Sequence, residues 1–161
     1  MKTHKFKKVL IALDYDPSAQ KVAETGFSLA KSIGAEVVLI HVISDPLNYS
    51  LTGHITVMGF AGYPATNILT TDDIDDLKKT SQHFLDKSKL HLGDKNIKTI
   101  VKEGDIAEFI LKSAEDMHAD IIVIGSHSRK WLEDIVMGSV TEKVLHRTSL
   151  PLYIVPTKQK K

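Results

Sequence analysis

ADIIVIGSHSRKWLEDIVMGSVTEKVLHRT, residues 119–148, is the stretch that decides the fold. It opens with an apolar, β-branched run that ends at Gly125, as expected of a buried strand. A second glycine, Gly138, stands directly before a helical pattern in which Ser139 and Glu142 have the spacing of a capping box. The stretch therefore predicts a strand, a long loop and a helix in succession.

Similar apolar runs recur along the chain, and most are continuous rather than alternating. A continuous run is expected of a strand that is covered on both faces of a parallel sheet. The predicted strands are Lys7–Leu13, Ala35–Ile43, Ile97–Gly104, Ala119–Gly125 and Leu150–Pro156.

Helical patterns fill the segments between these strands. The first should begin at Asp16, as cap, and Pro17, as first helical residue, and end at Gly34. Capping-box spacing predicts two more helix starts, at Asp105 and at Ser139. Another helix should span about 72–91, with one apolar face made of Ile74, Leu77, Phe84, Leu85 and Leu90.

The alternation of strands and helices predicts an α/β fold, a doubly wound parallel five-stranded sheet with helices on both faces. A chain of 161 residues, with 42% hydrophobic and 25% charged residues, fits one globular core. We therefore expect a single domain over residues 1–161. Residues 44–71 break the rhythm and are expected to form an inserted loop, either a lid or interface loop or a plain insertion.

Composition excludes several classes of protein. The net charge of +1 gives no electrostatic reason to expect a nucleic-acid partner. The absence of cysteine excludes disulfides and thiolate metal sites. No apolar run approaches the ~20 residues that span a bilayer, and the run near the start is too short for an export signal. We expect a cytoplasmic protein without a membrane span.

Candidate site residues fall at the ends of the predicted strands, where an open doubly wound sheet binds its ligands. Asp14, Val42 and Gly125 lie at or near such ends. Gly125 and Gly138 would let the backbone turn sharply and approach a ligand closely. Unpaired amides around Gly138, Ser139 and Val140, at the positive end of a helix, would favour an anion such as phosphate. Ser139 would either cap that helix or donate its hydroxyl to a phosphate oxygen.

Three stretches of the chain resemble the universal stress protein family of the UspA type. They are VLIALDYDPSAQKVAETGFSLAKSIGAEVVLIHV (9–42), VKEGDIAEFILKSAEDMHADIIVIGSHS (101–128) and MGSVTEKVLHRTSLPLYIVP (137–156). The ATP-binding subgroup carries glycine, two residues, glycine, nine residues, then glycine with serine or threonine. Here Gly125, Gly138 and Ser139 match, whereas Ser128 stands where the second glycine is expected.

The resemblance implies a Rossmann-like fold, also described as adenine nucleotide alpha hydrolase-like, and a role for each matching residue. Asp14 would bond the ribose hydroxyls or help to hold a metal, and Ala12 and Val42 would line the adenine slot. Ile124 and Gly125 would pass beside the sugar. Residues Ser128, Gly138, Ser139 and Val140 would hold the phosphates of ATP, or those of AMP or ADP.

The scattered histidines show no metal-ligand spacing, and His41, inside a strand, is expected to be a packed core residue. We therefore expect no protein-only metal site. Magnesium would enter with the nucleotide and be held mainly by phosphate oxygens, with Asp14 as a further candidate ligand.

The implied function is an adenine-nucleotide-binding sensor or regulator of a stress response, acting on protein partners that the sequence does not identify. No nucleophile and base with a suitable arrangement stand out, so no dedicated catalytic activity is expected, and slow ATP hydrolysis is left open. The resemblance also implies a homodimer through the strand at 150–156. Pro151 and Pro156 offer the alternative of a protected edge on a monomer.

Ser128 leaves a second function open. Serine at a position that needs a positive backbone angle would be strained, whereas its hydroxyl would help if only close approach of phosphate is needed. The alternative is a dimeric interaction module of the same fold that does not bind nucleotide.

Overall fold

The strands form one five-stranded sheet in the order β3-β2-β1-β4-β5, and every neighbouring pair is parallel. The computed structural model describes residues 2–15, 17–44, 74–126 and 137–157. Its elements along the chain are β1 Lys8–Ala12, α1 Ala19–Ile33, β2 Glu36–Ile43, α3 Ile74–Leu92, β3 Lys98–Glu103, α4 Ile106–Asp116, β4 Ile121–Gly125, α5 Ser139–Arg147 and β5 Leu152–Val155.

This topology confirms the predicted doubly wound α/β fold. The chain passes from β1 outward through β2 to β3, then crosses to the other side of β1 for β4 and β5. The winding therefore reverses between β1 and β4, which is where open sheets of this kind bind ligands. All five predicted strands are present, each trimmed at one or both ends.

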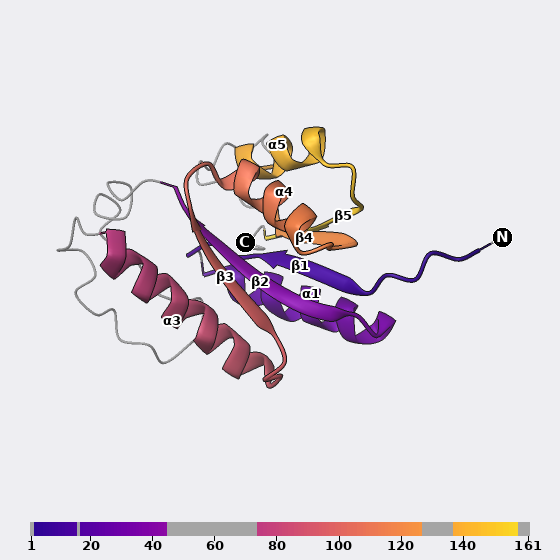
Figure 1. Cartoon of the computed structure of the whole chain (residues 1–161), viewed down its shortest axis with the longest axis horizontal. Helices are drawn as coiled ribbons and strands as arrows, with labels where there is room; N and C mark the ends of the chain where they lie inside the picture. Colours follow the sequence, from indigo (N-terminus) through magenta and orange to yellow (C-terminus); the bar gives the residue numbers. More distant parts are fainter. Residues whose placement is uncertain (1, 16, 45–73, 127–136, 158–161) are drawn as a thin grey trace.

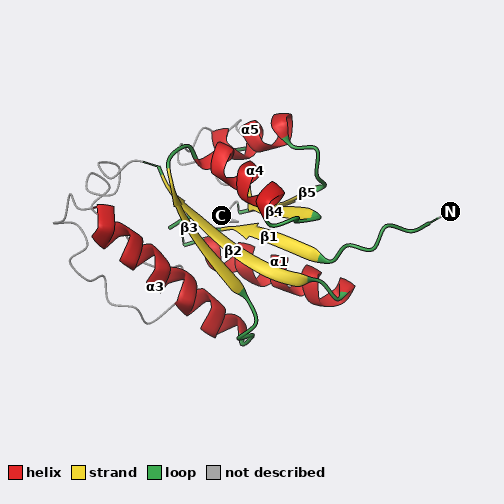
Figure 2. Cartoon of the chain, viewed as in Figure 1, coloured by secondary structure: helices red, strands yellow, loops and turns green. Residues whose placement is uncertain are grey.

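The helices cover both faces of the sheet (Figure 1). One face is covered by α1 and α3, which lie toward the bottom of the view, and the other by α4 and α5, toward the top. Figure 2 shows the twisted sheet as a yellow layer between red helices. Successive residues of β1 enter the two cores in turn: Val9 and Ile11 pack with α1 and α3, and Leu10 packs with α4 and α5.

Helix ends agree with the sequence in part. Gly34 ends α1 with φ +68°, the left-handed conformation expected of a terminal glycine. Asp105 caps α4, because its carboxylate accepts a hydrogen bond from the Glu108 amide at 2.8 Å. The predicted start of α1 was wrong: Pro17 and Ser18 form a turn and the helix begins at Ala19. Asp16 lies outside the described residues.

Three of the five residues predicted for the apolar face of α3 are buried. Leu77, Phe84 and Leu85 are buried, together with the small polar residues Ser81 and Ser88. Leu90 is 72% exposed, so its predicted place on this face was wrong. Leu90 follows Leu77 by thirteen positions, and at about 100° per residue this places it on the far side of the helix. The Ile74 side chain is not described.

The predicted insertion at 44–71 lies outside the described residues except for Ser44, so the expected lid, interface loop or plain insertion stays a prediction. None of the helices in the described ranges combines the length and apolar character that a membrane crossing requires.

Candidate functional site

The predicted site residues that the structure describes gather at the carboxyl edge of the sheet. Asp14 lies just beyond β1, Val42 is near the end of β2, and Gly125 ends β4. The segment from Gly138 to Val140 opens α5, which packs against α4 on one face of the sheet. Residues from four separate parts of the sequence therefore meet at the point where the winding reverses.

Four of these residues form an apolar wall. Ala12, Val42, Ile124 and Val140 all belong to the core cluster between the sheet and helices α4 and α5. Val42 and Ile124 are buried, whereas Ala12 and Val140 are partly exposed. The wall can accept the flat face of an apolar ring at its partly exposed positions.

Asp14 is half-buried and follows a backbone segment that is fixed at two points. The Leu13 amide donates to the carbonyl of Ile40 at 2.9 Å. The Leu13 carbonyl accepts a hydrogen bond from Nδ1 of His41 at 2.8 Å, so this ring nitrogen carries the proton. His41 is 2% exposed, which confirms it as a packed core residue.

The two ends of the loop between β4 and α5 are tied together. The Gly138 amide donates to the carbonyl of Ser126 at 3.1 Å. The Thr141 hydroxyl donates to the carbonyl of Gly125 at 2.8 Å. The expectation of a free Gly138 amide was therefore wrong, and the helix-start amides that remain for an anion are those of Ser139, Val140 and Thr141.

Neither predicted turn glycine adopts a left-handed backbone. Gly125 is the last residue of a strand, and Gly138 has φ −69° and ψ 157°. The positive φ values that the structure records for glycine are at Gly34, Gly93 and Gly104. A positive φ is therefore not what glycine supplies at Gly125 and Gly138, and close approach of a ligand to their backbone stays a prediction.

Ser139 is the first residue of α5, whose cap position is occupied by Gly138. The predicted capping by Ser139 was therefore wrong, because the residue sits one position too late. Its side chain is exposed at the start of the helix.

A cavity of about 260 Å³ adjoins the apolar wall at Val140. Ligand pockets commonly run from roughly 300 Å³ upward, so this hollow fits part of a nucleotide rather than all of it. Its remaining lining was not predicted from the sequence: Ser44, Gly104, Asp105, Ile106, Ala107 and Lys143. Lys143 brings a positive charge to the rim, one turn into α5.

Ser128 lies outside the described residues. Its contact with phosphate stays a prediction.

Three carboxylates with lowered pKa values lie away from this edge. A hydrogen bond from His91 is the main cause that lowers the pKa of Glu24, and one from Lys31 does the same for Asp94. The Lys7 amide is the main cause that lowers the pKa of Asp120, with further help from the Lys8 amide and His4. All three carboxylates tie structural segments together.

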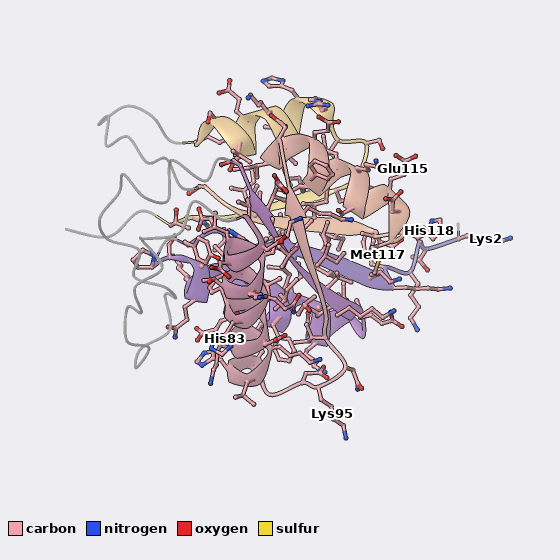
Figure 3. All side chains as sticks on the ribbon, turned by 60° about the vertical axis from the view of Figure 1, so that its left-hand side comes forward. Lys2, His83, Lys95, Glu115, Met117 and His118 are labelled. Atoms are coloured by element: carbon pink, nitrogen blue, oxygen red, sulfur yellow. The ribbon has the colours of Figure 1, made fainter. Side chains whose placement is uncertain are left out.

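Histidines are spread over the molecule. Figure 3 shows His83 on α3 and His118 beyond the end of α4, on different sides of the structure. Within the described ranges, histidine and carboxylate side chains form no group of three that would hold a metal ion.

The fold and the residues at this edge together define a doubly wound α/β protein with a candidate ligand site at the winding reversal, and comparison with known proteins identifies the family. The model of the universal stress protein family matches residues 5–156. The chain belongs to the universal stress protein family.

Individual relatives match over nearly their whole length. The chain is 30% identical to universal stress protein MJ0577 of Methanocaldococcus jannaschii, with 95% of this chain and 96% of the relative covered. It is also 30% identical to universal stress protein YxiE of Bacillus subtilis, with 93% and 99% covered.

Among solved structures, that of MJ0577 superposes with a TM-score of 0.71 at 28% identity, covering 98% of this chain and 100% of that one. A universal stress protein in complex with cAMP superposes with a TM-score of 0.62 at 16% identity, covering 96% and 100%. One from Archaeoglobus fulgidus in complex with dAMP gives 0.58 at 17% identity, covering 94% and 98%. The latter two show a shared fold.

Proposed function

We propose that this chain binds an adenine nucleotide, ATP or its products ADP or AMP, at the carboxyl edge of the sheet and acts as a sensor or regulator in a stress response. One observation carries the proposal: an apolar wall, a carboxylate and a helix N-terminus meet at the winding reversal. A nucleotide presents an aromatic base, a ribose diol and an anionic chain, and these three groups match those three surfaces in chemistry.

Each part of the site has a task in this proposal. The base lies against Ala12 and Val42, and the Asp14 carboxylate accepts hydrogen bonds from the ribose hydroxyls. The sugar passes Ile124 and Gly125, where the absence of a side chain leaves room.

The phosphates lie at the start of α5. The amides of Ser139 and Val140 and the Ser139 hydroxyl donate to phosphate oxygens, and the helix dipole favours the negative charge. Gly138 contributes space rather than a hydrogen-bond donor, because its amide already donates to the Ser126 carbonyl. Ser128 completes the phosphate contacts from the loop.

The solved universal stress proteins with cAMP and dAMP support an adenine nucleotide as the ligand class. Magnesium would accompany the phosphates and be held mainly by their oxygens, with the Asp14 carboxylate as a candidate protein ligand. Binding and release of the nucleotide, with at most slow hydrolysis, is the activity that we propose. A cytoplasmic location fits the cysteine-free composition, and cell fractionation tests it.

The proposal includes a homodimer through β5. This strand is at the edge of the sheet, and Tyr153 on it is 43% exposed. An unpaired edge is a ready template for pairing with a second copy of the chain.

Calorimetric titration of nucleotide-stripped protein with ATP and magnesium tests the proposal. We expect saturable binding that is weakened about tenfold or more in Asp14→Ala, because a charge-assisted hydrogen bond is lost. Asp116→Ala, which removes an exposed carboxylate at the end of α4, is the control and should bind like the wild type.

The absence of binding by folded wild-type protein would contradict the proposal. In that case Ser128→Gly decides between two explanations. Binding gained by Ser128→Gly would show that Ser128 closes the site and would favour the interaction module. A silent Ser128→Gly variant would remove the nucleotide from the function altogether.

A further inference from the structure

The buried hydroxyl of Thr141 is a feature that the proposed nucleotide contacts leave unexplained. Thr141 is 2% exposed and lies in the first turn of α5, where its side chain is directed at the end of β4. Valine has nearly the same shape and would fill the same space without a polar atom. The hydroxyl is therefore present for its hydrogen bond to Gly125, since a buried polar group without a partner is costly.

Gly125 needs this bond because it lies beyond the pairing of β4 with the central strand. The register of β1 and β4 ends at Ile11 and Val123. The carbonyl of Gly125 accepts its hydrogen bond from the Thr141 hydroxyl instead, at 2.8 Å. Helix α5 is thereby fixed to the last residue of β4 through a side chain.

Ser126 forms the second tie at the base of the same loop. Its amide donates to the Val155 carbonyl at 2.9 Å, and its carbonyl accepts from the Gly138 amide at 3.1 Å. Its hydroxyl accepts from the Thr157 amide at 3.0 Å. The loop therefore leaves and returns through a base that is fixed to both β5 and α5.

We propose that Thr141 is a positioning residue for nucleotide binding, an inference that rests on the proposed function. Its hydroxyl sets the distance and angle between the end of β4, along which the sugar would pass, and the amides of Ser139 and Val140, which would receive the phosphates. Thr141 itself does not contact the nucleotide through its side chain, because that group is buried against Gly125. Loss of the Thr141 hydroxyl should therefore weaken the binding of the phosphates and leave the binding of the base and sugar nearly unchanged.

The test compares ATP with adenosine, which has the same base and sugar but no phosphate. Calorimetric affinities for both ligands, and melting temperatures, are measured for the wild type, Thr141→Val and Thr141→Ser. We expect Thr141→Val to lose about tenfold in ATP affinity, with a change of less than about threefold for adenosine. Thr141→Ser keeps the hydroxyl and should recover ATP affinity to within about threefold of the wild type.

Ser88→Ala is the matched control. The Ser88 hydroxyl is fully buried in α3 and donates to the Phe84 carbonyl at 2.9 Å, so the variant loses a buried side-chain hydrogen bond within one helix on the opposite face of the sheet. It should lower the melting temperature and leave the ratio of ATP to adenosine affinity at the wild-type value.

An unchanged ratio of ATP to adenosine affinity in Thr141→Val, whether both affinities stay the same or both fall equally, would overturn the positioning role. Failure of Thr141→Ser to recover ATP affinity would also overturn it. Failure of the proposed function is read separately, from the wild-type protein alone, because a wild type that binds no ATP removes both proposals.

Discussion

The phenol oxygen of Tyr15 lies 2.6 Å from the hydroxyl oxygen of Ser81, and this contact joins the end of β1 to the middle of α3. The Tyr15 ring also packs against His41 and Phe84, with centroid distances of 4.4 and 5.1 Å. Asp14 therefore lies between Leu13, which His41 holds, and Tyr15, which α3 holds. The carboxylate that we assign to the ribose is supported from both sides.

Tyr15→Phe removes the phenol oxygen and keeps the ring. Because Ser81 is fully buried, we expect the free energy of unfolding in urea to fall by about 1 kcal/mol. Tyr153→Phe removes a hydroxyl from an exposed residue of β5 and should change stability little. Equal stability of the two variants would show that the Tyr15–Ser81 contact does not hold α3 to β1.

Gly26→Ala should destabilise the protein although alanine favours helices. A Cβ at Gly26 would lie 2.8 Å from Cδ1 of Ile11 and 3.1 Å from Cγ1 of Val123, and both side chains are fully buried. Overpacking of this kind costs about 1–3 kcal/mol, which exceeds the gain of about 1 kcal/mol in helix propensity.

Ser28→Ala, at an exposed position of the same helix, is the control for helix propensity and should be neutral or slightly stabilising. Thermal unfolding of the two variants beside the wild type measures the difference. A Gly26→Ala protein that melts at or above the wild-type temperature would mean that α1 can move away from the sheet without cost.

Asp120 should make stability depend on acid pH. Its carboxylate accepts hydrogen bonds from the amides of Lys7 and Lys8 at 2.8 and 3.0 Å, and these bonds lower its pKa in the folded state. A lowered folded pKa contributes stability above the unfolded pKa of about 3.9, and this contribution is lost as the pH falls through the folded pKa.

Asp120→Asn should therefore be less stable than the wild type near pH 6, and the two should converge as the pH falls below the unfolded pKa of about 3.9 and through the lowered folded pKa. Asp116→Asn removes an exposed carboxylate and is the control for charge alone. Urea unfolding at a series of pH values gives the comparison, and parallel curves for wild type and Asp120→Asn would refute the assigned role.

Ile154→Pro tests the proposed dimer through β5. The carbonyls of Pro151 and Val155 accept hydrogen bonds from β4, so the alternate residues Leu152 and Ile154 direct their backbone groups toward the free edge. Proline at 154 removes an outward donor while leaving the pairing with β4 intact. We expect light scattering to show a dimer for the wild type and a monomer for this variant.

Ile154→Val keeps the amide and most of the side chain, and should remain a dimer. A monomeric wild type, or a dimer that persists in Ile154→Pro, would contradict pairing through this strand.

The sequence predicts the strands well because the three central strands, β2, β1 and β4, are nearly continuous apolar runs buried on both faces, as in Val9–Ile11 and Ile121–Ile124. It predicts the helix starts less well. A capping pattern states which residue types stand near a helix end, but it does not choose between Gly138 and Ser139. The choice depends on where the chain leaves β4, since Gly138 is held by the Ser126 carbonyl.

The placement of candidate site residues at the carboxyl edge was predictable where a residue stands at or near the end of a strand, as for Asp14, Val42 and Gly125. Thr141 gave no signal, because a threonine in a first helical turn is ordinary until the helix is packed against Gly125. The cavity beside Val140 was missed for a similar reason: Ser44, Asp105 and Lys143 come from three distant segments and carry no shared spacing.

Titration of the isotope-labelled protein with ATP and magnesium, followed by backbone amide chemical shifts, tests most directly whether a nucleotide binds between β1 and the start of α5. Saturable shifts are expected at Asp14, Gly125, Ser139 and Val140. The amides of Glu36 and Asp120, which lie at the opposite edge of the sheet, should not shift. Absence of saturable shifts in the folded protein, or shifts confined to that opposite edge, would contradict the proposed site.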